Sequence, residues 1–147
     1  MSEPRRKKVL LVDDDPEVRS IFRTALARED LETDEAVNGV AALEMIETHD
    51  YALVLLDLLM PAMGGGEVLE RLRNVEPRPI VLVVSGASDV LIDSIDPSLI
   101  HGVVRKPFDP IEVAGLVKAC VEIRTRRSLD TMCLLSMVAS AQFFRWL

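Results

Sequence analysis

Short apolar stretches alternate along the chain with segments of helical periodicity, and this alternation limits the possible folds more than any other feature. The stretches are rich in Val, Ile and Leu and are bounded by turn-forming residues, which is typical of strands buried on both faces. Strands alternating with helices predict a parallel sheet that is covered by helices on both faces. The predicted strands are 9–12, 31–37, the stretch from Tyr51 that ends at Asp57, 80–84 and 100–105. The predicted helices are 16–26, 40–49, 67–74, an interrupted one within 88–99, and 110–127.

The length of the chain and the handedness of crossovers restrict the topology further. A chain of 147 residues suits one domain. Right-handed crossover connections leave few topologies, and the natural order for five strand–helix units is 2-1-3-4-5. We therefore predict an α/β fold, a flavodoxin-like (βα)5 doubly wound parallel sheet over residues 8–127. A basic, flexible tail (1–7) is expected before it and an apolar, helical extension (128–147) after it.

Charge and cysteine content exclude several classes of protein. The net charge is −7, which argues against direct binding to nucleic acid, because such a surface needs clustered Lys and Arg. Cys120 and Cys133 are the two cysteines of the sequence, and their spacing is not that of a metal site. So few cysteines are typical of a reducing, cytoplasmic setting. The apolar stretch after the basic start is too short for a secretion signal. Residues 128–147 are short and are interrupted by Asp130 and Arg145, so no membrane span is expected.

Polar side chains stand where the predicted strands end. They are Asp13 and Asp14 after the first strand, Asp57 at the third, Ser85 at the fourth and Lys106 after the fifth. In the predicted strand order the first and third strands are neighbours, so three carboxylates would crowd together at one edge. A hard cation such as Mg²⁺ (or Mn²⁺) would relieve their repulsion. With a lysine and a hydroxyl to hold phosphoryl oxygens, the set suits phosphoryl transfer onto a carboxylate.

Four motifs resemble the receiver domain of two-component response regulators. They are LLVDDDP, LLDLLMPAMGG, VVSGA and VVRKPF, in this order over about 8–124. The resemblance implies that Asp57 accepts a phosphoryl group from a sensor histidine kinase or a histidine phosphotransfer protein. It also implies a signalling role rather than an enzyme's, with self-catalysed phosphoryl acceptance and a change of conformation or oligomeric state as the output.

The resemblance also assigns roles to individual residues. Asp14, Asp57 and the backbone carbonyl of Leu59 are expected to bind the metal directly, and Asp13 is expected to bind it through water. Lys106 is expected to pair first with Asp57 and then with the phosphoryl group. Ser85, followed by Gly86, is expected to turn towards the phosphoryl group. The peptide bond between Lys106 and Pro107 is expected to be cis.

Several positions depart from the family pattern. Val103 stands where the family often has a switching Tyr or Phe, and Gly64 stands where an acid is common. Pro97 shortens the fourth helix, which puts the usual form of a common dimer surface in doubt. Leu59 and Ala87 are apolar at positions where polar groups help to orient the attacking water. We therefore expect slow self-dephosphorylation.

Two other functions fit parts of the sequence. A hydrolase of the haloacid dehalogenase type would use Asp13 as the nucleophile, but it needs a later acidic pair at a strand end, and the acids after Lys106 begin the last helix. A receiver-like interaction module could keep the fold and act without phosphorylation. Val103 and the shortened fourth helix leave that alternative open.

The C-terminal extension over 128–147 is unusually apolar. Exposed apolar surface of this size usually marks an interface, so a homodimer formed through this segment is expected, with exchange of the segment between chains as one route. The alternatives are that the segment folds back on its own domain or is the remnant of a longer protein.

Overall fold

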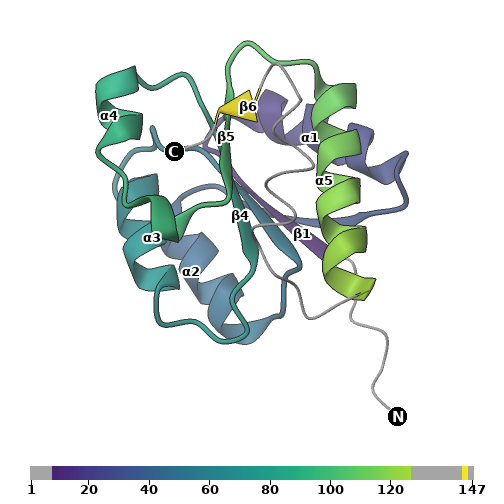
Figure 1. Cartoon of the computed structure of the whole chain (residues 1–147), viewed down its shortest axis with the longest axis horizontal. Coiled ribbons are helices and arrows are strands. Elements are labelled where there is room, and N and C mark those ends of the chain that lie inside the picture. The colour runs from purple at the N-terminus through teal and green to yellow at the C-terminus, as the bar shows by residue number, and fades with distance from the viewer. Residues whose placement is uncertain (1–7, 127–143, 146–147) are drawn as a thin grey trace.

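The computed structural model describes residues 8–126 and 144–145, and these form one central sheet with helices on both faces (Figure 1). The strands are β1 (Lys8–Val12), β2 (Glu32–Ala36), β3 (Leu53–Leu56), β4 (Ile80–Ser85), β5 (Gly102–Arg105) and β6 (Phe144–Arg145). The helices are α1 (Pro16–Ala27), α2 (Gly39–Thr48), α3 (Gly65–Leu72), α4 (Asp89–Asp93), the 3₁₀ turn η1 (Pro97–Leu99) and α5 (Pro110–Arg126). Among these helices, none has both the length and the apolar run that a membrane span requires.

The strand order is β2-β1-β3-β4-β5-β6, and β1 to β5 are parallel. The predicted order 2-1-3-4-5 is therefore confirmed. β6 adds an antiparallel edge, with Val104 opposite Phe144 and Val103 opposite Arg145. These two residues of the predicted helical extension are thus in a strand. The rest of that extension and the tail 1–7 lie outside the described residues.

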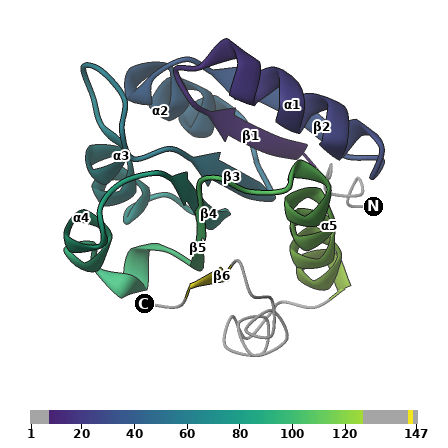
Figure 2. The same cartoon turned by 90° about the horizontal axis from the view of Figure 1, so that it is seen from above.

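Two apolar cores lie on opposite faces of the sheet, because side chains alternate between faces along each strand. Val9 and Leu11 of β1 pack in the core beneath α1 and α5, whereas Leu10 and Val12 pack in the core beneath α2, α3 and α4. Figure 2 shows the sheet between these two layers of helices. The doubly wound architecture follows directly from strands that are apolar on both faces.

Local sequence signals set the ends of the helices. Asp15 caps α1 by accepting a hydrogen bond from the Glu17 amide, and Pro16 occupies the first helical position. Ser88 caps α4 in the same way. α4 ends at Asp93, and Pro97 begins the separate turn η1, so the predicted shortening of the fourth helix is observed.

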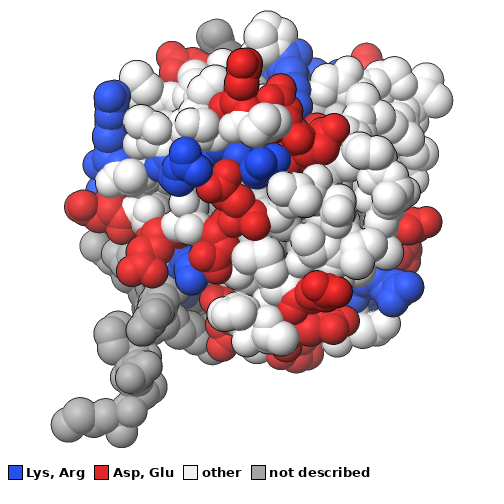
Figure 3. Space-filling model, turned by 180° about the vertical axis from the view of Figure 1, so that it is seen from behind, with Lys and Arg blue, Asp and Glu red and all other residues white. Residues whose placement is uncertain are grey.

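Charged side chains of both signs share the surface. On the face in Figure 3, Lys and Arg lie next to Asp and Glu. Neighbouring elements are joined by ion pairs, including Lys8–Asp34 between β1 and β2 and Arg23–Glu35 between α1 and β2. The second of these pairs ties the first helix to the edge strand β2.

Candidate functional site

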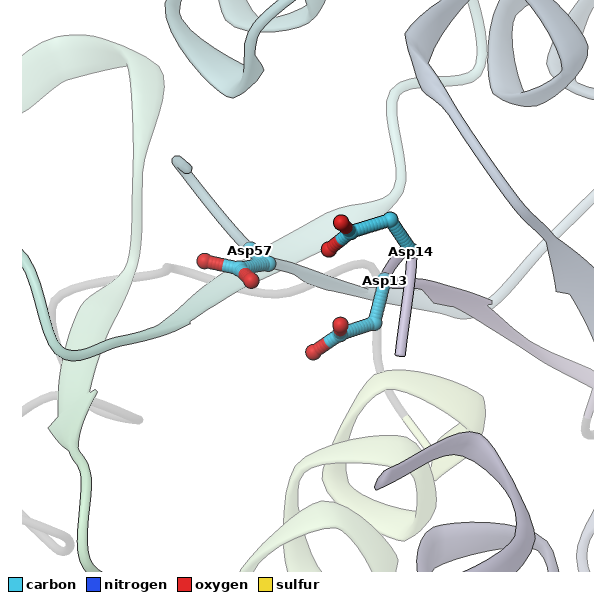
Figure 4. Close-up of side chains that lie close together, drawn as sticks. All are labelled: Asp13, Asp14 and Asp57. Carbon is cyan, nitrogen blue, oxygen red and sulfur yellow. The ribbon is translucent and has the colours of Figure 1, made fainter. Parts of the chain in front are cut away.

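The carboxyl ends of β1 and β3 place three acids together (Figure 4). Asp13 and Asp14 follow β1, and Asp57 follows β3, which is paired with β1. One carboxylate oxygen from each of the three lies within 4.8 Å of the other two. Asp13 and Asp57 are buried, and Asp14 is exposed to solvent. The predicted convergence of the acids therefore exists in the folded chain.

Lys106 completes the charged set from the end of β5. Its Nζ lies 3.3 Å from Asp57 Oδ2 and 3.3 Å from Asp13 Oδ2. Burial lowers the pKa of Lys106, but the charges of Asp57 and Asp13 outweigh this and raise it above its ordinary value. The lysine is therefore a cation at neutral pH and partly neutralises the two buried acids.

Asp13 is held in an unfavourable environment for a charge. Burial raises its pKa; the hydrogen bond from the Asp15 amide opposes this, while the negative charge of Asp57 adds to it. Its Oδ1 accepts the hydrogen bond from the Asp15 amide at 2.9 Å. Burial and the charge of Asp57 together outweigh the hydrogen bond from Asp15 and the charge of Lys106, so the pKa of Asp13 lies above its ordinary value.

Backbone contacts fix the position of Asp57. Its amide donates to the Val12 carbonyl at 2.9 Å, which joins the end of β3 to the end of β1. Its Oδ1 accepts a hydrogen bond from the Leu59 amide at 3.1 Å. The start of α3 packs tightly beside it, because a Cβ on Gly65 would lie 2.6 Å from the Asp57 carbonyl oxygen. Gly65 was not among the predicted site residues, although the run of three glycines is the sequence signal for it.

Ser85 and Lys106 are joined through the backbone. Ser85 is fully buried at the end of β4, and its carbonyl accepts a hydrogen bond from the Lys106 amide at 3.2 Å. Its hydroxyl accepts a hydrogen bond from the Ala87 amide at 3.1 Å. Gly86 is exposed, and a Cβ there would meet the Lys106 Cβ at 3.9 Å, an ordinary contact. The Lys106–Pro107 peptide bond is cis.

Two of the apolar departures from the family pattern, Leu59 and Val103, differ in exposure. Leu59 has 54% of its surface exposed beside Asp57, so its side chain reaches solvent. Val103 is fully buried, pairs with Val83 and belongs to the core beneath α2, α3 and α4. The position of the family's switching aromatic is thus occupied by a small core residue.

The donor set fits a small, hard divalent cation. Carboxylate oxygens are ligands that Mg²⁺ and Mn²⁺ prefer, and Mg²⁺ needs only one or two carboxylates because it keeps several waters. Asp14 and Asp57 offer such oxygens, and Asp14 is open to solvent on one side. Three carboxylates face one ammonium group here, and this excess of negative charge also favours a cation. The residues present therefore match Mg²⁺ or Mn²⁺.

Comparison with known proteins agrees with this site. A family profile described as "Response regulator receiver domain" matches residues 9–118. The transcriptional regulatory protein SrrA of Staphylococcus aureus is 35% identical over 113 residues, which are 76% of this chain and 46% of SrrA. This chain thus spans less than half the length of that relative.

Solved structures with the same fold include response regulators. The response regulator TrrA from Thermotoga maritima, in complex with Mg²⁺ and BeF, is 30% identical with a TM-score of 0.69, covering 78% of this chain and 98% of TrrA. The receiver domain of a Francisella response regulator is 26% identical with a TM-score of 0.72, covering 80% of this chain and 98% of that domain. On this evidence the chain belongs to the response regulator family of two-component signalling, with its receiver domain over residues 9–118.

Proposed function

We propose that Asp57 accepts a phosphoryl group and that the chain works as a phosphorylation-controlled receiver. The observation that carries this proposal is the position of Asp57. It is buried at a strand end, lies within 4.8 Å of two further acids and is 3.3 Å from a lysine amine. A carboxylate can act as a nucleophile towards phosphorus where positive charge is placed to balance the phosphoryl oxygens.

The transfer step follows from the chemistry of a phosphohistidine donor. An oxygen of the Asp57 carboxylate attacks phosphorus, the phosphorus–nitrogen bond breaks, and the electron pair stays on the departing imidazole nitrogen. Lys106, now 3.3 Å from Asp57, exchanges part of this ion pair for the new phosphoryl oxygens. The donor is a sensor histidine kinase or a histidine phosphotransfer protein.

Asp14, Asp57 and the backbone carbonyl of Leu59 would hold Mg²⁺ (or Mn²⁺), and Asp13 would hold it through water. When bound, the ion would supply charge neutralisation at the phosphoryl oxygens. Of these groups, the exposed carboxylate of Asp14 and the buried one of Asp13 are already placed at the same strand end by the short β1–α1 turn. The protein's part is to keep these oxygens gathered while they repel each other.

The signal depends on a change at the ends of β4 and β5. In the structure, the Ser85 hydroxyl accepts a hydrogen bond from the Ala87 amide at 3.1 Å. After transfer, the hydroxyl leaves this amide and donates to a phosphoryl oxygen instead. Gly86 allows the adjacent backbone to move with it. Phosphorylation thereby shifts the population between two conformations of the segment before α4. Because Val103 is a buried core residue, the output does not use a swinging aromatic ring at that position.

Phosphorylation with a small donor tests the assignment. The chain is incubated with acetyl phosphate and Mg²⁺, and the gain of one phosphoryl group is followed by intact-mass spectrometry. We expect no gain for Asp57→Asn and a slower but measurable gain for Asp13→Asn. The reverse pattern would indicate a hydrolase with its nucleophile at Asp13. No gain in the unaltered chain would favour the module that acts without phosphorylation.

We also propose that residues 128–147 support a homodimer through the edge of the sheet. The supporting observation is that Phe144–Arg145 (β6) pairs with β5 in antiparallel register. The same backbone hydrogen bonds could form with β5 of a second copy, which is the usual basis of strand exchange. Solution mass should show a dimer for the full chain and a monomer after truncation at residue 126. The same oligomeric state for the full and the truncated chain would contradict this role.

A further inference from the structure

Arg19 links the acidic turn after β1 to the edge strand β2. Its Nη1 donates a hydrogen bond to the Asp13 carbonyl oxygen at 2.7 Å, and its Nε donates to the Glu35 carboxylate at 3.1 Å. The side chain is only 13% exposed, so these contacts are largely shielded from water. We propose that Arg19 is a positioning residue that sets the orientation of the Asp13–Asp14 pair.

The contact acts on the backbone between the two acids. The Asp13 carbonyl belongs to the same rigid peptide unit as the Asp14 amide, so holding that oxygen also fixes the direction in which the chain enters Asp14. The other side of Asp13 is held as well, because its amide donates to the Ala36 carbonyl of β2 at 3.2 Å. Arg19 and β2 thus hold the backbone of Asp13 at both its amide and its carbonyl.

The contact with Asp13 is one of geometry rather than of charge, because Arg19 donates to a neutral backbone carbonyl. The Glu35 carboxylate lies beside the Arg19 guanidinium and also pairs with Arg23 at 2.6 Å, so its single negative charge is shared between two arginines. The rigid fork of a guanidinium can donate to Asp13 and to Glu35 at the same time, whereas a lysine amine at the end of a flexible stem cannot reproduce both directions. A lysine at position 19 is therefore expected to keep the positive charge but not to hold the Asp13 carbonyl and Glu35 at the same time.

Arg23 provides a matched control. It binds the same carboxylate of Glu35 from the same helix, but its side chain is 53% exposed and its hydrogen bonds are with Glu35 and Ser20. Removing Arg23 therefore takes an ion pair away from α1 and β2 and leaves the hydrogen bond to Asp13 in place. The comparison separates positioning of the acids from general support of the helix.

This role deepens the proposed function and rests on it, because the consequence of losing Arg19 is weaker binding of the metal. The full chain is titrated with Mn²⁺ alone, and the free ion is followed by electron paramagnetic resonance. Removal of an outer-shell contact typically weakens metal binding by 10- to 100-fold; we expect about tenfold weaker binding for Arg19→Gln and for Arg19→Lys. Arg23→Gln should bind as the unaltered chain does.

Urea unfolding in EDTA shows whether each variant is folded and how much stability it has lost. A folded Arg19→Gln that binds Mn²⁺ as tightly as the unaltered chain would overturn the positioning role, as would restored binding in Arg19→Lys or an equal loss in Arg23→Gln. If the unaltered chain itself binds no Mn²⁺, the metal site of the proposed function fails instead. The two failures are therefore distinguishable.

Discussion

Lys106 Nζ lies 3.3 Å from Asp57 Oδ2, although 49 residues separate the two along the chain. The same nitrogen is 3.3 Å from Asp13 Oδ2, so one ammonium group faces two buried carboxylates. This arrangement leaves an excess of negative charge in a partly desolvated site. The excess has consequences for stability as well as for metal binding.

Asp13→Asn is expected to make the chain more stable at neutral pH when divalent metal is absent. Burial and the charge of Asp57 raise the pKa of Asp13 above its ordinary value of 3.8. A carboxyl group whose pKa is raised by folding destabilises the fold at pH values above that raised pKa, and the penalty is absent below 3.8. Urea unfolding in EDTA should show a gain of about 1 kcal/mol at pH 7 that disappears towards about pH 3.

Asp15→Asn is the control for that experiment. Asp15 is an exposed cap of α1, and Asn caps a helix as well as Asp does. The free energy of unfolding of the Asp15→Asn variant should therefore hardly differ from that of the unaltered chain. A loss of stability in Asp13→Asn at pH 7 would show that the ion pair with Lys106 outweighs the repulsion from Asp57.

The acids, the serine and the lysine could be predicted from the sequence because each follows a short apolar stretch. Val12 and Leu56 end strands that are buried on both faces. A polar residue directly after such a strand lies where the carboxyl ends of the strands meet. The strand order follows from general rules of connection. Local pattern was therefore enough to bring together residues that are far apart in the sequence.

The contacts of Gly65 and Arg19, and the pairing of β6, could not be predicted in this way. Gly65 matters because the Asp57 carbonyl approaches it, and Arg19 matters because it reaches Asp13 and Glu35 from two other elements. The pairing of Phe144–Arg145 with β5 joins residues about 40 apart that have no common local pattern. Such contacts depend on how the helices and strands pack against one another, which the spacing of apolar residues in the sequence does not reveal.

Gly65→Ala is expected to destabilise the fold and to disturb Asp57. An added Cβ would lie 2.6 Å from the Asp57 carbonyl oxygen and 2.8 Å from the Leu58 Cα, both backbone atoms that cannot turn aside. Forced displacement of packed atoms costs about 1–3 kcal/mol. Urea unfolding should show this loss, and phosphorylation by acetyl phosphate should slow.

The neighbouring Gly66→Ala is the matched control. Apart from its chain neighbours and the backbone of its own helix, α3, no atom lies within 4 Å of a Cβ at that position. Replacing glycine by alanine in a helix stabilises it by about 0.5–1 kcal/mol. Equal behaviour of the two variants would show that the close approach at Gly65 is unimportant.

Tyr51→Phe is expected to destabilise the chain in a pH-dependent way. The Tyr51 hydroxyl donates a hydrogen bond to Asp34 Oδ2 at 2.7 Å, and Lys8 Nζ lies 2.9 Å from the same oxygen. Burial opposes ionisation of Asp34, but these two hydrogen bonds outweigh it and lower its pKa below the ordinary value of 3.8. The hydroxyl should therefore contribute about 1 kcal/mol at neutral pH.

The sign of the pH dependence follows from the lowered pKa of Asp34. Stability that comes from a carboxyl group with a lowered pKa is present above 3.8 and is lost as the pH falls through the lower value in the folded chain. Urea unfolding of the two proteins should differ at pH 7 and differ less at about pH 2. A difference that does not change with pH would assign the effect to packing of the ring.

Phosphorylated Asp57 is expected to lose its phosphoryl group slowly, over many minutes or longer, because apolar side chains occupy the positions that could orient a water molecule. Leu59 is 54% exposed next to Asp57, and Ala87 is buried beside Ser85. Neither side chain can donate or accept a hydrogen bond. The half-life is measured after removal of the donor, with no phosphatase present, by following the mass of the intact protein.

Leu59→Asn places an amide beside the phosphoryl group, where it can hydrogen-bond a water molecule, and should shorten the half-life several-fold. Ile21→Asn is a suitable control because Ile21 is similarly exposed, at 46%, but lies on α1. Its half-life should match that of the unaltered chain. A half-life of seconds in the unaltered chain would show that water is oriented by other groups, and the backbone amides of Leu59 and Ala87 would then be the nearest candidates.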